Sequence, residues 1–164
     1  METKNKLIKT AKGCYVAAKV LYCLSFAVCL AFIILAIVLP LTGHPVGSLT
    51  SAETAVLFAT LALYTFICIG LLWNVEGLFK CVARERSPFN EGVNHYLKKI
   101  AIFVLALAIV PAIIGSVVMK IVDADTEIVF PVSVAGIIGG IVLFFMGWVF
   151  HYGMDLQKQD DETL

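Results

Sequence analysis

The chain has 164 residues, of which 60% are hydrophobic and 15% are charged, and its mean hydropathy is +0.95. Soluble domains are typically about half apolar, so this composition excludes an ordinary soluble domain. The formal net charge is zero, and we expect no direct nucleic-acid binding.

Four long apolar runs without charged side chains dominate the sequence. They cover residues 20–41, 54–75, 100–119 and 128–150. A helix of about 20 residues crosses the hydrocarbon core of a bilayer, where the backbone groups of such a run must be bonded internally. Few residues remain for a soluble domain of typical size. The sequence therefore predicts an all-α membrane protein with a single domain, a four-transmembrane-helix bundle.

The distribution of positive charge predicts the orientation of the four spans. Of the 12 lysines and arginines, all but Lys120 lie before the first run's core, in segment 76–99 or in the tail. Cytoplasmic segments carry such an excess of positive charge. We therefore expect both termini in the cytoplasm (N-in/C-in). The first run is too long for a signal-peptide core, so we expect it to remain as a membrane helix.

The segments outside the runs also indicate local structure. The pattern of residues 1–19 predicts a lysine-rich amphipathic helix, and we expect its lysines to lie among anionic headgroups. The second run continues into an amphipathic stretch, in which Leu78 and Phe79 fall on one face of a helix and Lys80 and Arg84 on another. Residues 87–90 then break the helix before an apolar stripe leads into the third run. This pattern predicts an amphipathic cytoplasmic helical hairpin between helices 2 and 3.

Small residues in three of the runs predict where the helices pack. Lipid tails provide no hydrophobic drive between helices, so close packing depends on small side chains. Such residues recur on one face of each of these runs: Gly70 and Gly77; Ala108 and Gly115; Ser133, Gly136, Gly140 and Gly147. We expect a compact bundle within one chain, with homodimerisation through Gly136 and Gly140 as the alternative. We also expect Pro111 to kink the third span and Asn74 to form a bond between helices.

The apolar runs offer little for chemistry. No Asp, Glu, Lys, Arg or His lies inside them, whereas proton relays and ion-coupled transport usually need such groups at bilayer depth. The five cysteines have no CxxC spacing, and we expect free thiols. No positioned nucleophile, acid–base pair or metal-ligand spacing is present. We therefore expect no enzyme, no metal site and no cofactor.

Two cytoplasmic patches resemble a known family. The first comprises Leu78-Phe79-Lys80, the run from Arg86 to Asn90, and Leu97-Lys98-Lys99-Ile100-Ala101; the second runs from Val149 to Gln157 and closes on Asp161-Glu162-Thr163-Leu164. Together they resemble the YoaS-like bacterial membrane family. The resemblance implies a four-helix protein of the bacterial inner membrane without an assigned activity. Family members are often encoded beside a small helix-turn-helix transcription regulator, so it also implies a cytoplasmic regulator as partner.

These observations lead to a non-enzymatic function as the first expectation. The most specific residues are cytoplasmic, so we expect this face to bind or restrain a cytoplasmic protein. The expected partner-binding residues are Lys80, Arg84, Arg86, Pro88, Phe89, Asn90, Asp155 and Gln157. A small oligomeric transporter or export component is the alternative, and a membrane-embedded enzyme comes third.

Overall fold

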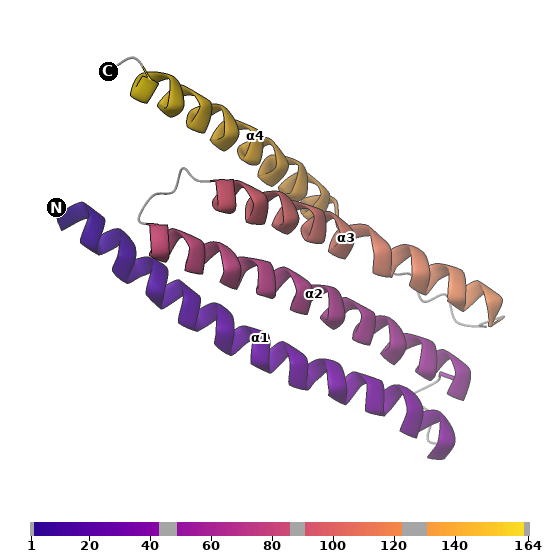
Figure 1. Ribbon diagram of the computed structural model, residues 1–164. Coiled ribbons are helices and arrows are strands. Elements are labelled where there is room, and N and C mark those ends of the chain that lie inside the picture. Colours follow the sequence, from indigo (N-terminus) through magenta and orange to yellow (C-terminus); the bar gives the residue numbers. More distant parts are fainter. Residues whose placement is uncertain (1, 43–48, 86–90, 123–130, 163–164) are drawn as a thin grey trace.

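The computed structural model describes residues 2–42, 49–85, 91–122 and 131–162, and these contain four helices and no strand. The helices are α1 (Glu2–Thr42), α2 (Ser51–Glu85), α3 (Glu91–Ile121) and α4 (Val134–Glu162) (Figure 1). The expected all-α class is confirmed.

Each helix is long and apolar enough to cross a membrane. The candidate spans are Lys9–Thr42, Ser51–Arg84, Glu91–Ile121 and Val134–Leu156. Even the shortest helix, α4 with 29 residues, is about 44 Å long at 1.5 Å per residue. A hydrocarbon core is about 30 Å thick, so every helix extends beyond it. The expectation of four apolar helices of membrane-spanning length is confirmed.

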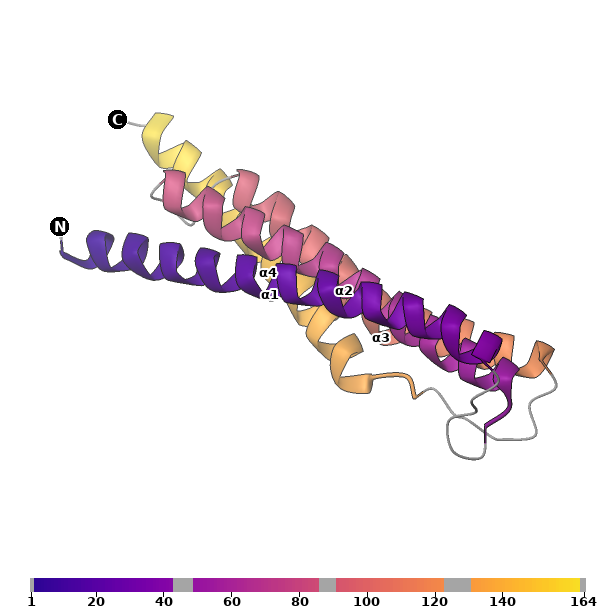
Figure 2. The ribbon, with the colours of Figure 1, turned by 90° about the horizontal axis from the view of Figure 1, so that it is seen from below.

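The helices are arranged as an open row. Within the described residues, α1 packs only on α2, α2 also packs on α3, and α3 also packs on α4. Figures 1 and 2 show that consecutive helices run in opposite directions. The first turn of α1 and the last turn of α4 therefore lie on the same side of the molecule, although these helices are the two outermost of the row. This row differs from the compact bundle that the small-residue faces predicted. Lipid is as apolar as leucine, so no hydrophobic force closes the row.

Burial is concentrated on α3, which has a neighbour on each side. In the most apolar stretch of α3, 33% is buried inside the protein, whereas in the corresponding stretch of α1 only 6% is buried. The helix continues through Pro111, whose side chain is fully buried. Large apolar side chains on the outer faces, such as Leu24 and Ile34 of α1 and Phe145 of α4, are exposed. Such faces suit a lipid environment, in which apolar exposure carries no penalty.

α1 packs on α2 through small side chains that the sequence analysis did not single out. Ala11, Ala18 and Cys29 of α1 are buried. The Cys29 thiol donates to the carbonyl oxygen of Ala62 across 3.6 Å. Two ring contacts accompany this interface, with centroids 5.7 Å and 6.2 Å apart: Tyr22 with Trp73, and Phe32 with Phe58.

A capping box fixes the start of α2. Glu53 Oε2 accepts hydrogen bonds from the Thr50 backbone N–H, at 2.7 Å, and from the Thr50 hydroxyl, at 2.9 Å. The Glu53 backbone N–H donates in turn to Thr50 Oγ1 at 3.3 Å. This reciprocal pairing satisfies backbone donors that have no partner in the first turn of a helix. The buried Glu53 carboxylate is therefore part of the helix start.

α4 begins later than the sequence predicted. The fourth span was expected from residue 128, but residues 131–133 are not helical and α4 starts at Val134. Ser133 caps the helix, because its Oγ accepts the Gly136 N–H at 3.1 Å. The Ser133 N–H donates to the Ala108 carbonyl oxygen of α3 at 3.2 Å. Ser133 is thus a cap of α4 that also ties this helix to α3.

α2 and α3 are unbroken up to the segment that joins them. The amphipathic stretch from Leu78 to Arg84 forms the last turns of α2, which continues to Glu85, and α3 begins at Glu91. Residues 86–90 lie outside the described residues. The surface hairpin therefore stays a prediction.

Candidate functional site: a polar cleft between α2 and α3

The expected partner-binding residues are only partly described. Lys80 and Arg84, near the end of α2, are exposed, as is Asp155 on α4. Arg86, Pro88, Phe89 and Asn90 lie outside the described residues, as does the side chain of Gln157. Within the described chain α2 and α4 do not contact each other, so the structure does not bring Lys80 or Arg84 against Asp155.

The expected packing residues of α3 and α4 lie against one another. A Cβ built on Gly136 would lie 2.8 Å from Ala108 Cβ, and one on Gly140 would lie 2.6 Å from Leu105 Cγ. Gly147 faces Lys98, whose Cγ would be 3.3 Å from such a Cβ. Gly115 is also buried on α3. The Gly136 and Gly140 face, considered above for a homodimer, therefore packs on α3 of the same chain.

Two glycines on α2 each face an aromatic ring of α3. A Cβ on Gly70 would overlap ring carbons of Phe103, and a Cβ on Gly77 would overlap ring carbons of Tyr96. The glycines are two helical turns apart, and so are the two rings, because residues seven apart lie on one face of a helix. The helices run in opposite directions (Figure 1), so Gly70 pairs with Phe103 and Gly77 with Tyr96. Together they set the register of α2 on α3.

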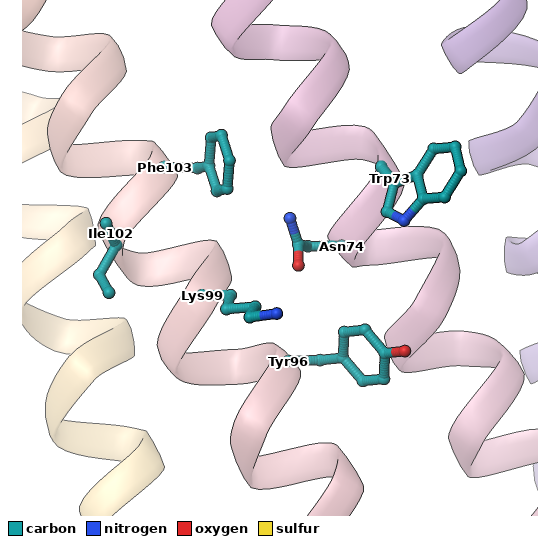
Figure 3. Close-up of a pocket in the computed structure, with 6 residues that line it drawn as sticks. All are labelled: Trp73, Asn74, Tyr96, Lys99, Ile102 and Phe103. Carbon is teal, nitrogen blue, oxygen red and sulfur yellow. The ribbon is translucent and has the colours of Figure 1, made fainter.

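A polar cleft lies between these two pairs. It has a volume of about 370 Å³ and is lined by Trp73, Asn74, Tyr96, Lys99, Ile102 and Phe103. Figure 3 shows Phe103 at one end, Tyr96 at the other, and Asn74 and Lys99 between them from opposite helices. The Lys99 amine points from α3 toward α2, into the gap between Asn74 and Tyr96.

Hydrogen-bond donors predominate in the cleft. The Asn74 side chain is 7% exposed, and its Nδ2 donates to the Gly70 carbonyl oxygen at 2.7 Å. This bond is within α2, so the expectation of a bond between helices was wrong for it. The Asn74 oxygen lies on the side of Lys99 (Figure 3), and the donors of the cleft are carried by Lys99, Tyr96 and Trp73. None of the described residues that line the cleft is acidic. The arrangement can therefore bind an anionic group.

A second cleft, of about 250 Å³, lies further along the same pair of helices and is almost entirely apolar. It is lined by Ala55, Val56, Ala59, Thr60, Leu63, Ile114 and Val118. The Thr60 hydroxyl donates to the Val56 carbonyl oxygen of its own helix at 2.8 Å. Thr60, the one polar side chain among the described residues of this lining, thus already donates its hydroxyl hydrogen within α2.

No disulfide links the five cysteines, all of which lie in the described residues: Cys14, Cys23, Cys29, Cys68 and Cys81. In the part of the chain that the structure describes, no three His, Cys, Asp or Glu residues gather where they could hold a metal ion.

The polar cleft is not evident from the sequence alone. There, Lys99 stands out only through a family resemblance, and Gly70, Gly77 and Asn74 are expected in helix packing. The available signal was the common spacing of seven residues, which places Gly70 and Gly77 on one face and Tyr96 and Phe103 on another. That spacing identifies two faces but does not identify them as partners.

The fold and site define an all-α protein with four candidate membrane spans. Comparison with models of known protein families, with curated proteins and with solved structures finds no match.

Proposed function

We propose that this is a non-enzymatic multi-pass protein of the bacterial inner membrane. It would bind or restrain a cytoplasmic protein at its lysine-rich end, the end of the molecule that carries Lys80 and Arg84. One observation carries the proposal: α2 has 35 residues, about 52 Å, and so projects beyond a hydrocarbon core with exposed Lys80 and Arg84 near its end. Both termini would then be cytoplasmic, because the charge distribution favours that orientation. The preferred partner surface is acidic, since it would meet two exposed cations.

The resemblance to the YoaS-like family suggests which protein to test first. If a small helix-turn-helix transcription regulator is encoded beside this gene, it is the first candidate partner. The surface would be completed by Arg86, Pro88, Phe89 and Asn90 and by the α4 residues Asp155 and Gln157.

A charge-reversal experiment tests this function. Tagged wild-type protein, the double variant Lys80→Glu/Arg84→Glu and the control Lys120→Glu are purified from membranes, and co-purifying proteins are quantified by mass spectrometry. We expect one cytoplasmic protein to be recovered with the wild type and the control, to be lost from the double variant, and to bind the purified wild type directly. Equal recovery of every cytoplasmic protein from all three would contradict the proposal. Reporter fusions to each variant check that its orientation is unchanged.

A transporter or export component is the second candidate function, and the polar cleft favours it. Lys99 and Asn74 lie at the edge of otherwise apolar spans, and the open row leaves outer faces of α1 and α4 through which copies could assemble. Proteoliposomes loaded with an anion would show protein-dependent efflux if the cleft were part of a pathway. The absence of such efflux alongside specific partner binding would favour the first function.

A further inference from the structure

The cleft between α2 and α3 lies where the apolar runs stop. The run 54–75 finishes at Asn74 and Val75, and the run 100–119 begins directly after Lys99. Trp73 and Tyr96 lie at the same level, and such aromatic residues favour the membrane–water interface. In a bilayer this places the cleft at the boundary between hydrocarbon and headgroups, the depth of lipid phosphates.

The cleft opens toward the bilayer. Trp73 is 61% exposed and Ile102 is 56% exposed, one on each of the two helices that form it. Both side chains are apolar over most of their surface, so acyl chains can lie against them. A ligand with a polar head and an apolar tail therefore fits the surroundings better than a free ion does.

The walls of the cleft are held in place before any ligand arrives. Asn74 is fixed by its bond to the Gly70 carbonyl oxygen, and the rings of Phe103 and Tyr96 lie against α2 at Gly70 and Gly77. Lys99 points into the space between (Figure 3). Charge-assisted hydrogen bonds from an ammonium to phosphate oxygens are among the strong ones, and no acidic side chain of the described lining competes.

We propose that this cleft binds the phosphate headgroup of an anionic phospholipid, with Lys99 as the donor and the tail along Trp73 and Ile102. The volume of about 370 Å³ lies within the range of small-molecule sites. The site is separate from the exposed cations of the proposed partner surface, because neither Lys80 nor Arg84 lines it.

Tryptophan fluorescence provides a direct test, because the chain has two tryptophans and one lines the cleft. In a Trp148→Phe background, Trp73 is the only tryptophan. Its quenching by brominated phosphatidylglycerol, relative to brominated phosphatidylcholine, measures the lipid preference at the cleft. We expect phosphatidylglycerol to be preferred about fivefold, the typical effect of one lysine on anionic lipid binding.

Matched variants separate a built site from general surface attraction. Lys99→Gln should remove the preference, Lys99→Arg should keep it, and Lys98→Gln should keep it because Lys98 lies against Gly147 of α4. Circular dichroism confirms that each variant is folded. An unchanged preference in Lys99→Gln, or an equal loss in Lys98→Gln, would overturn the proposal. Millimolar inorganic phosphate should not displace the lipid; if it did, the cleft would be a site for free phosphate.

Discussion

The substitution Gly136→Ala tests the close approach of α4 to α3. The new Cβ would lie 2.8 Å from Ala108 Cβ, whereas ordinary contacts begin at 3.4 Å. The Ala108 methyl group cannot rotate out of the way, so the helices must separate, and a shift of about 0.6 Å restores an ordinary contact. That movement also stretches the bond from Ser133 N–H to the Ala108 carbonyl oxygen.

The magnitude follows from two opposing effects. Overpacking of this kind costs about 1–3 kcal/mol, and replacement of glycine by alanine in a helix returns about 1 kcal/mol. We expect Gly136→Ala to lower the free energy of unfolding by up to about 2 kcal/mol, and to leave the protein about 1–3 kcal/mol less stable than a glycine-to-alanine change without overpacking. Gly139→Ala is the matched control, because nothing lies within 4 Å of its added Cβ, and it should be neutral or stabilising.

Unfolding by SDS in mixed micelles, followed by circular dichroism, measures both variants. Equal stability of Gly136→Ala and Gly139→Ala would refute the packing of this face on α3. If Gly136 instead mediated a homodimer, its variant would shift the oligomeric state and leave the stability of the monomer unchanged.

Three further substitutions have expected outcomes in the same assay. Thr50→Ala removes a cap of α2 and should lower the free energy of unfolding by about 1 kcal/mol. Its control is Ser51→Ala at the exposed next residue, which should lower it by less than about 0.5 kcal/mol. Equal losses would contradict the capping box. Thr60→Val should change stability by less than about 0.5 kcal/mol, since the hydroxyl bonds only within its own helix, and a large loss would reveal another partner. Gly77→Ala should destabilise by up to about 2 kcal/mol, because its Cβ meets the Tyr96 ring, and Gly13→Ala, with nothing near, is its control.

Hydropathy predicted the four helices because length and lack of charge suffice for that purpose. It misplaced the start of α4, since residues 128–133 are as apolar as a membrane helix while Ser133 acts as the cap. Small residues marked the faces that pack, as at Gly70 and Gly140. Spacing alone could not say that Gly77 meets Tyr96, because the register between two helices depends on the shapes of both.

The open row and the polar cleft could not be predicted for a related reason. In lipid, an apolar face that meets a helix looks the same in sequence as one that meets acyl chains. Asn74 donates to a carbonyl oxygen of its own helix, where a bond between helices was expected. Lys99 lies one residue before an apolar run, so its role depends on the helix opposite, which the sequence does not specify.

The most direct test of the proposed function is the orientation of the chain, since a cytoplasmic partner requires the lysine-rich end inside. Reporter fusions after Gly47 and Asp125 should report the outside, and fusions after Phe89 and Leu164 should report the cytoplasm. The charge distribution, with Lys120 as the only cation in the predicted outside loops, predicts this result. A cytoplasmic signal at Gly47 would contradict the orientation and, with it, the proposed partner surface.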